Sequence, residues 1–320
     1  MISPFKRWLP RAAGCTAAAA LATVVLRATI ADRTPLSAWV FYFVPLPLAA
    51  LALVGAALLF AAAMRPRSAI AAACAAASLY GFWTFAHTFN ERCEVALPSD
   101  LHVVSWNVNH LRRGMEAVAD RLAATDADVI GLVEGSHPSA KHLAFWRSRF
   151  PGHTVILPGG GLVLIVRGNV VTSDMRELIG ISRLLVADVE IDGAALRLAL
   201  ADLDASPRFD KKTLLERTFD AARGGDTLPT IVMGDFNTPI DSLWFRAVRE
   251  RYVHAFEKAG TGFLATWPAE WPFLAIDHIW AGRGLTATCA RLEVSPLSDH
   301  SMFRAVFRRG GIRATTEPPL

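Results

Sequence analysis

The sequence predicts an α/β domain at residues 95–309, preceded by an all-α transmembrane region at residues 1–94. Residues 1–94 contain long apolar stretches with almost no acidic residues. From Leu101 onward, short apolar runs alternate with amphipathic stretches, which is the pattern of mixed strands and helices. No internal repeat or boundary interrupts this second part, so it predicts one α/β domain.

The N-terminal region is expected to form about three transmembrane helices. Their apolar stretches are Ala12 to about Ile30, Ser37 to Met64, and Ser68 to about Phe89. The second is longer than the ~20 residues that span a bilayer, and membrane helices tolerate prolines such as Pro45 and Pro47. Arg27 interrupts the first stretch, which leaves open a signal peptide cleaved near Ala31.

Basic residues predict the orientation of these helices. Those before the first stretch and between the second and third are Lys6, Arg7, Arg11, Arg65 and Arg67. Such clusters stay in the cytoplasm, so three crossings place residues 95 onward outside. We therefore expect a multi-pass protein of the cell membrane with a periplasmic or extracellular domain. A hydrophobic soluble bundle is the disfavoured alternative, because uncharged runs of this length are rare in soluble folds.

The formal charge of +4 is unevenly divided. Residues 1–94 carry 8 Lys and Arg against 3 Asp and Glu, a net of +5, whereas residues 95–320 carry 25 against 26, a net of −1. A protein that grips a nucleic-acid backbone usually has a positive excess. Long nucleic acid is therefore a less favoured substrate for the second part.

The cysteines carry no metal signature. Cys15 and Cys74 lie in the membrane stretches, and only Cys93 and Cys289 belong to the exterior part. The exterior compartment would allow a disulfide between them. We expect unpaired small apolar side chains instead, because nothing in the spacing favours a bond.

The elements of the α/β domain follow from the apolar pattern. Strands are expected at Leu101–Trp106, Val129–Val133, Leu162–Val166, Leu184–Val189, Leu196–Ala201, Pro229–Met233, Ile276–Trp280, Ala287–Leu292 and Phe303–Phe307. Helices are expected at Gly114–Ala124, Ala140–Phe150 and Lys211–Ala222. Residues 310–320, which are rich in glycine and proline, are expected to form a disordered tail.

Polar motifs close several of the apolar runs. In chain order they are Ser105–Asn109, Leu132–Glu134, Gly234–Asn237, Ile276–His278 and Ser298–His300. A polar residue that closes a buried strand lies at the edge of the core, and the ends of several strands can converge there. A cluster of Glu, Asp, Asn and His without cysteine suits Mg²⁺ or Mn²⁺ better than zinc.

In these motifs the chain resembles the endonuclease/exonuclease/phosphatase (DNase I-like) superfamily, in a membrane-anchored form of bacterial type. These Mg²⁺-dependent phosphodiesterases include nucleases, neutral sphingomyelinases and inositol-phosphate phosphatases. One tetrapeptide would be weak evidence, but five motifs in order over residues 98–309 are specific. The resemblance implies a two-sheet, four-layer α/β/β/α sandwich.

The resemblance also implies a metal site and a catalytic site. Glu134 would be the main metal ligand, Asp299 would bind the metal directly or through water, and Asn107 would sit beside the metal and the scissile phosphate. Asp235 would activate the attacking water, and Asn237 would hold that water or the developing oxyanion.

His300 would contact phosphate, oriented by a hydrogen bond from its far nitrogen to Asp277. His278 and the remaining histidines lack such a context, and we expect them at the surface or as helix caps.

One position departs from the family pattern. Where relatives place a His-Leu pair at the end of a central strand, this chain reads Asp202-Leu203. An anion there repels phosphate unless it is protonated or binds a metal. A shifted register, with His137 or a loop residue substituting, is the alternative.

The segment Phe263–Phe273 is a proline-containing loop with several large aromatic rings. It is predicted to pack over the sheet edge, and a membrane-facing rim beside the active site is the alternative.

The expected function is that of a membrane-anchored, extracytoplasmic, Mg²⁺-dependent phosphohydrolase. Its substrate would be a phosphodiester or pyrophosphate, lipid-linked because tethering concentrates membrane lipids around the site. Mn²⁺ is expected to substitute for Mg²⁺. The alternatives are an extracytoplasmic nuclease and a non-catalytic binding domain on the same fold. The sequence does not predict an oligomeric state.

Overall fold

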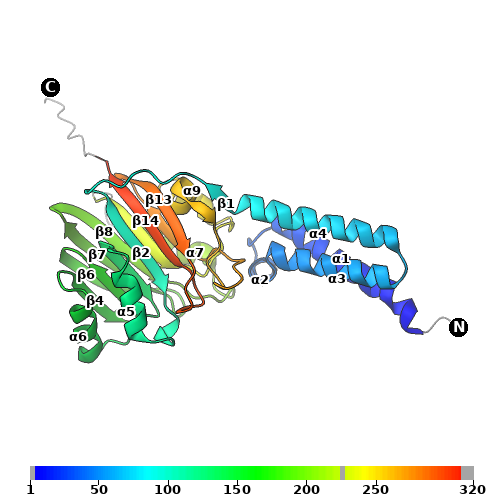
Figure 1. Ribbon diagram of the computed structural model, residues 1–320, viewed down its shortest axis with the longest axis horizontal. Coiled ribbons are helices and arrows are strands. Elements are labelled where there is room, and N and C mark those ends of the chain that lie inside the picture. Colours follow the sequence, from blue (N-terminus) through cyan, green and yellow to red (C-terminus); the bar gives the residue numbers. More distant parts are fainter. Residues whose placement is uncertain (1–3, 224–227, 311–320) are drawn as a thin grey trace, which may run out of the picture. The chain divides into compact units, whose positions relative to one another are not determined.

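A computed structural model describes residues 4–223 and 228–310 (Figure 1). The chain divides into two compact units. One comprises Met1–Thr88 with Asp241–Leu243, and the other comprises Phe89–Ile240 with Trp244–Leu320. Apart from Gly310, the predicted tail lies outside the described residues.

The first unit is helical. Its helices are α1 (Pro4–Thr29), α2 (Pro35–Phe43), α3 (Leu46–Ala62) and α4 (Pro66–Ala86). Thr34 caps α2, because its side chain accepts a hydrogen bond from the Ser37 N–H. Alanines let the helices approach closely, as Ala20 and Ala76 do beside Leu53 in a small buried cluster.

The second apolar stretch is not one continuous helix, and that prediction was wrong. Val44 leaves the helical region with φ −121° and ψ 69°, and α3 restarts after Pro45 at 71° to α2. Proline disfavours helical geometry at the residue before it, which explains the break. Among the described residues, α1 from Trp8 and all of α4 are each long and apolar enough to cross a membrane, and the bent pair would be a third span if it acts as one.

The second unit is an α/β sandwich, which confirms the predicted fold class. Two mixed sheets face each other within residues 89–223 and 228–310. The first runs β13 (Leu285–Glu293), β14 (Met302–Arg309), β2 (Leu101–Asn107), β3 (Val129–Val133), β5 (Leu162–Val166), β4 (Thr154–Gly159). The second runs β10 (Val253–His254), β12 (Asp277–Ala281), β9 (Thr230–Asp235), β8 (Ala194–Asp202), β7 (Arg183–Ile191), β6 (Asn169–Glu177).

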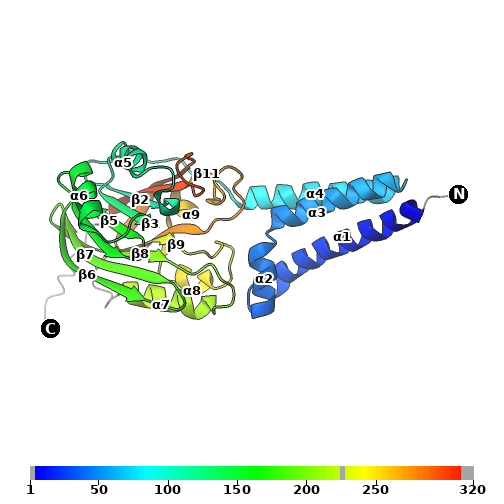
Figure 2. The ribbon, with the colours of Figure 1, turned by 90° about the horizontal axis from the view of Figure 1, so that it is seen from below.

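Helices cover the outer faces. Helices α5 (Met115–Ala123) and α6 (Ala140–Arg149) lie against the first sheet, whereas α7 (Lys211–Arg223) and α8 (Phe245–Arg249) lie against the second (Figure 2). The shorter elements are η1 (Asn109–Leu111), α9 (Ala255–Ala259), and the strand pair β1 (Thr88–Asn90) and β11 (Thr261–Phe263). Alternate residues of one strand serve different layers: Val103 packs in the core between the sheets, and Val104 packs under α5.

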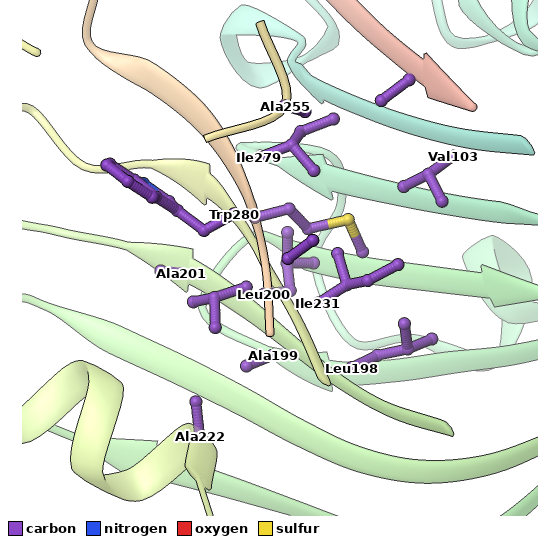
Figure 3. Packing of buried hydrophobic residues seen from close by; sticks show 14 of the residues in the cluster. Val103, Leu198, Ala199, Leu200, Ala201, Ala222, Ile231, Ala255, Ile279 and Trp280 are labelled. Carbon is purple, nitrogen blue, oxygen red and sulfur yellow. The ribbon is translucent and has the colours of Figure 1, made fainter. Parts of the chain in front are cut away.

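The sheets approach closely in the middle of the sandwich. Side chains such as Val103, Leu198 and Ile231 fill the layer between them (Figure 3). Gly131 on β3 permits this approach, because a Cβ there would lie 2.8 Å from the Leu200 Cδ1 atom. Apolar side chains thereby fill the interior between the sheets.

Each sheet contains one parallel pair of central strands, β2 with β3 and β8 with β9. The carboxyl ends of parallel strands meet at one edge. Asn107 ends β2, Glu134 follows β3, and Asp202 and Asp235 end β8 and β9. The topology thus gathers the polar motifs of the sequence at one end of the sandwich.

Cys93 and Cys289 form a disulfide, so the expectation of unpaired thiols was wrong. Their separation of 196 residues gave no local signal. The fold brings them together because Cys289 lies on β13 and the segment after β1 runs beside that strand, where the Glu94 N–H bonds the Thr288 carbonyl.

Candidate active site

Asn107 connects two carboxylates from different sheets. Its Nδ2 atom donates hydrogen bonds to Asp235 Oδ2 at 3.0 Å and to Glu134 Oε1 at 3.3 Å. Its own amide oxygen accepts from the Asn109 N–H at 3.0 Å. Asn107 is buried, so these bonds satisfy an amide that could not turn to water.

The turn after β9 aims Asp235 and Asn237 at the same region. Asp235 Oδ1 accepts from the Asn237 N–H at 2.8 Å, and the Asn237 side chain donates to the Leu203 carbonyl at 2.8 Å. Gly234 makes this turn feasible, because its φ is +131° and a Cβ would lie 2.0 Å from the Ala201 carbonyl oxygen.

Asp277 and His300 form the pair that the sequence predicts. His300 Nδ1 donates to Asp277 Oδ2 at 2.9 Å, and His300 Nε2 lies 4.0 Å from Asp235 Oδ2. Ser298 fixes the backbone beneath them, since its hydroxyl donates to the Asn107 carbonyl and accepts from the His300 N–H. The imidazole therefore turns its second nitrogen toward Asp235.

Asp299 is held by neutral donors. Its Oδ1 accepts from Asn109 Nδ2 at 2.7 Å, and its Oδ2 accepts from the Trp267 indole at 3.2 Å. Asn109 thereby joins Asp299 to Asn107, and through Asn107 to Glu134. Neutral N–H donors around carboxylates are the usual supports of metal ligands.

The oxygen-rich donor set fits a hard divalent cation. Glu134 and Asp299 supply carboxylates, and Asn107 would offer its oxygen if its amide rotated by half a turn. Among the described residues, Asp235, Asp277 and His300 form a tighter cluster, with ligand-type atoms within 4.8 Å of one another. We do not assign the metal there, because a His300 that bonds Asp277 and carries a proton has no lone pair to give.

Burial and neighbouring charges set the titration of the site. Burial, and then Asp277, raise the pKa of Asp235 to about 7, against the opposing effect of His300. Burial disfavours the charge on His300, but Asp277, with Asp235 and Asp299, raises the pKa of this imidazole to about 10. His300 is therefore a cation at neutral pH, and Asp235 changes its protonation close to neutrality.

Asp202 lies in the site, as the predicted register requires. It pairs with Asp235 across the parallel strands β8 and β9. Burial first, then the carboxylates of Asp235 and Glu134, raise the pKa of Asp202 to about 8.

The backbone around the site is strained at residues that are not glycine. Asn109, His110 and Leu111 adopt φ values of 48°, 54° and 56°, and Glu134 and Asn237 adopt 54° and 45°. Left-handed backbone costs about 1 kcal/mol or more per residue for side chains other than glycine. Such strain collects where function requires a particular geometry.

Sequence reasoning missed His110 and Lys211, which lie near the site. His110 extends its Nε2 to 3.1 Å from Glu134 Oε2, from a side chain that is 63% exposed. Lys211, which is buried, donates from Nζ to the main-chain carbonyls of Asp204 and Asn237. Neither residue stands in a recognisable motif, so only the fold reveals its position.

His278 is not at the surface, and that prediction was wrong. His278 and His254 are both buried, and their Nδ1 and Nε2 atoms lie 3.3 Å apart. His278 Nε2 donates to the Thr238 carbonyl at 2.9 Å, and His254 Nδ1 accepts from the Glu257 N–H. His254 does cap α9, but from inside the core.

The aromatic loop is packed over most of its length. Leu264, Thr266 and Ala269 are buried, and the Ala269 N–H bonds the Asp299 carbonyl at 2.7 Å. Trp267 lies beside His300, with ring centroids 6.5 Å apart. Trp271 is the exception, because 82% of its surface is exposed.

Comparisons with known proteins agree with this architecture. The sequence profile described as the Endonuclease/Exonuclease/phosphatase family matches residues 104–300. No curated protein sequence matches the chain.

Solved structures share the fold at low identity. D. rerio TDP2 complexed with single strand DNA product is 17% identical with a TM-score of 0.54, over 66% of this chain and 99% of that chain. The mannosyl-6-phosphatase Bt3783 of Bacteroides thetaiotaomicron is 15% identical with a TM-score of 0.55, over 65% and 99%. TDP2 from C. elegans is 18% identical with a TM-score of 0.55, over 67% and 76%.

Proposed function

Because the chain belongs to the endonuclease/exonuclease/phosphatase family, we propose that it is a membrane-anchored, metal-dependent phosphohydrolase whose catalytic domain lies outside the cytoplasm. The observation that carries this proposal is the hydrogen-bonded convergence of Asn107 and Glu134 from one sheet with Asp235 from the other. Carboxylates gathered in this way serve hydrolysis of phosphate esters or anhydrides better than they serve a purely structural role.

In the proposed mechanism each group has a distinct role. Asp235, whose pKa is about 7, accepts a proton from the attacking water while the Asn237 N–H keeps its carboxylate in place. His300, a cation held by Asp277, stabilises the negative charge that develops on the phosphoryl oxygens.

A divalent cation held by Glu134 and Asp299, with Asn107 beside it, would supply Lewis-acid stabilisation of the phosphoryl oxygens. We propose Mg²⁺, with Mn²⁺ as a substitute, because the donors are oxygens. The Asn109 amide and the Trp267 indole hold Asp299 in place for that role.

A lipid-linked phosphodiester or pyrophosphate is the proposed substrate. The apolar helices α1 and α4 would tether the domain to a bilayer, which raises the effective concentration of lipid headgroups. Residues 95–320 have a net charge of −1 and therefore offer little general attraction to a polyanion. The disulfide of Cys93 and Cys289 supports a location outside the reducing cytoplasm.

The proposal is tested with the full-length protein in nanodiscs. Its Mg²⁺-dependent turnover is compared on a lipid pyrophosphate, a phospholipid, single-stranded DNA and double-stranded DNA. We expect one of the lipid substrates to be hydrolysed fastest, Mn²⁺ to replace Mg²⁺, and EDTA to abolish turnover. Faster cleavage of DNA would instead support the nuclease function, and no turnover of any substrate would support a binding domain.

A further inference from the structure

Arg183 ends a row of charged residues that crosses the second sheet. Arg183 on β7 is in register with Asp202 on β8, Asp202 with Asp235 on β9, and Asp235 with Asp277 on β12. Residues paired across adjacent strands point to the same face of a sheet, so these four side chains line one edge of the site. His300, bonded to Asp277, closes the row at its other end.

The turn between β4 and β5 makes room for the Arg183 side chain. A Cβ at Gly160 would lie 2.2 Å from Arg183 Cδ and 2.7 Å from its Nε. The next residue, Gly161, supports Glu134 in the same way, since a Cβ there would lie 3.2 Å from the Glu134 Cα. Arg183 and Glu134, the proposed metal ligand, thus pack against consecutive glycines of one turn.

The Arg183 guanidinium makes no hydrogen bond to another described residue. Within residues 4–223 and 228–310, the structure shows no hydrogen bond or ion pair from it, although Asp202 is its cross-strand neighbour. By contrast, Arg197 on the neighbouring strand β8 is bonded to Asp188. Two nitrogen atoms of its guanidinium donate to this carboxylate, at 2.6 and 2.7 Å. An arginine without a partner beside several carboxylates is a ready donor for an incoming anion.

We propose that Arg183 binds the phosphoryl group of the substrate and supplies the positive charge that position 202 lacks. The inference rests on the proposed function and specifies a further substrate-binding residue. The phosphate would lie between two cations, with His300 on the side of Asp277 and Arg183 on the side of Asp202. A guanidinium fits this place because its planar fork can contact two phosphoryl oxygens at once.

The test compares Arg183→Gln and Arg183→Lys with Arg176→Gln in the full-length protein in nanodiscs. Arg176 is a matched control, because it lies on the adjacent strand β6 and is exposed. The readouts are the Kd of inorganic phosphate in the presence of Mg²⁺, measured by calorimetry, and the kcat and KM of bis(p-nitrophenyl) phosphate. Thermal unfolding reports whether each variant is folded.

We expect Arg183→Gln to weaken phosphate binding at least about tenfold and to lower kcat/KM similarly, because a charge-assisted contact is lost. Arg183→Lys should recover part of the loss, and Arg176→Gln should stay within about twofold of the native protein. A phosphate Kd for Arg183→Gln within about twofold of the native value would overturn the inference, whatever the activity. A native protein that binds phosphate through Arg183 but hydrolyses nothing would overturn the proposed function alone.

A second pair of variants tests the same contact without changing the arginine. Gly160→Ala should displace the Arg183 side chain and weaken phosphate binding. In a protein that already carries Arg183→Gln, the same change should have little further effect on phosphate binding. Gly193→Ala is its control, because Gly193 also has a positive φ, of +74°, but has open space where its Cβ would stand. Normal phosphate binding by a folded Gly160→Ala protein would contradict the proposed path of the side chain.

Discussion

Asp202 stands at the position where the resemblance in the motifs leads us to expect a histidine, and its surroundings decide what it can do there. Burial and the neighbouring Asp235 and Glu134 raise its pKa to about 8, so it holds a proton at neutral pH. A neutral carboxylic acid does not repel phosphate and can donate a hydrogen bond to it. The substitution is therefore compatible with catalysis.

We predict that Asp202→Asn keeps turnover within about threefold of the native value, because an amide matches the shape and donor capacity of the protonated acid. Asp202→His should raise turnover, up to about tenfold, by adding a charge-assisted donor. Steady-state kinetics and Mn²⁺ binding by calorimetry measure both. Weaker Mn²⁺ binding by Asp202→Asn would show that Asp202 is a metal ligand instead.

His254 and His278 join α9, β12 and the turn after Asn237 through one chain of hydrogen bonds. The Glu257 N–H donates to His254 Nδ1, and the Thr238 carbonyl accepts from His278 Nε2. The 3.3 Å contact between the rings must then run from His254 Nε2–H to His278 Nδ1. Both imidazoles are neutral in this arrangement, because a second proton on either ring would face a donor or disrupt the chain.

This pair should contribute a loss of stability in acid. Burial depresses the pKa of His278 to about 4 and that of His254 well below its usual 6.5. At these two histidines the unfolded chain binds protons first, so each contributes a loss of stability of about 1.4 kcal/mol per pH unit as the pH drops from about 6.5 toward 4. Asp202 and Asp235, whose pKa values are raised to about 8 and about 7, act in the opposite sense over this range, because the folded chain binds those protons first. Urea unfolding followed by tryptophan fluorescence at several pH values measures the slope.

His254→Leu should remove the contribution of that histidine to the slope of stability against pH, and a matched substitution of the exposed His137 should leave the slope as in the native protein. A slope for His254→Leu equal to that of the native protein would contradict the neutral pair.

The disulfide ties the segment after β1 to β13. Because it closes a loop of 196 residues, replacing Cys93 and Cys289 by serine should cost on the order of 4 kcal/mol of unfolding free energy. The matched control replaces Cys15 and Cys74, which are free and exposed. Equal stability of both double variants in denaturant titrations would show that the bond does not constrain the folded unit.

The apolar runs of the sequence predicted the central strands because those strands are buried on both faces. They could not predict β6, since Asn169–Glu177 lies at a sheet edge and is mostly exposed, which leaves no apolar run. The apolar run at residues 196–201 predicted β8, which covers Ala194–Asp202. His110, Lys211 and Arg183 were not, because their partners lie on segments distant in the chain and only the fold brings them together.

At the scale of the whole molecule, two independent features favour an exterior catalytic unit. Basic residues gather before α1 and in the loop between α3 and α4, and the catalytic unit contains a disulfide. Both features bear on the compartment in which this unit lies and not on the reaction that it catalyses.

We predict that a reporter fused after residue 320 is active outside the cytoplasm and that one fused near residue 66 is active inside. With the amino terminus inside, as its basic residues predict, this result requires three crossings, so the bent pair α2 and α3 acts as one span. Paired alkaline phosphatase and green fluorescent protein fusions distinguish the two sides. An interior carboxyl terminus would mean an even number of crossings and a cytoplasmic substrate.

The most direct test of the central claim is the metal-dependent turnover of Glu134→Gln in the full-length protein, with the exposed Glu116→Gln as control. If Glu134 holds the catalytic cation, turnover should fall at least about 10²-fold and Mn²⁺ binding should weaken, while Glu116→Gln behaves as the native protein. Full metal-dependent turnover by Glu134→Gln would contradict the proposed site.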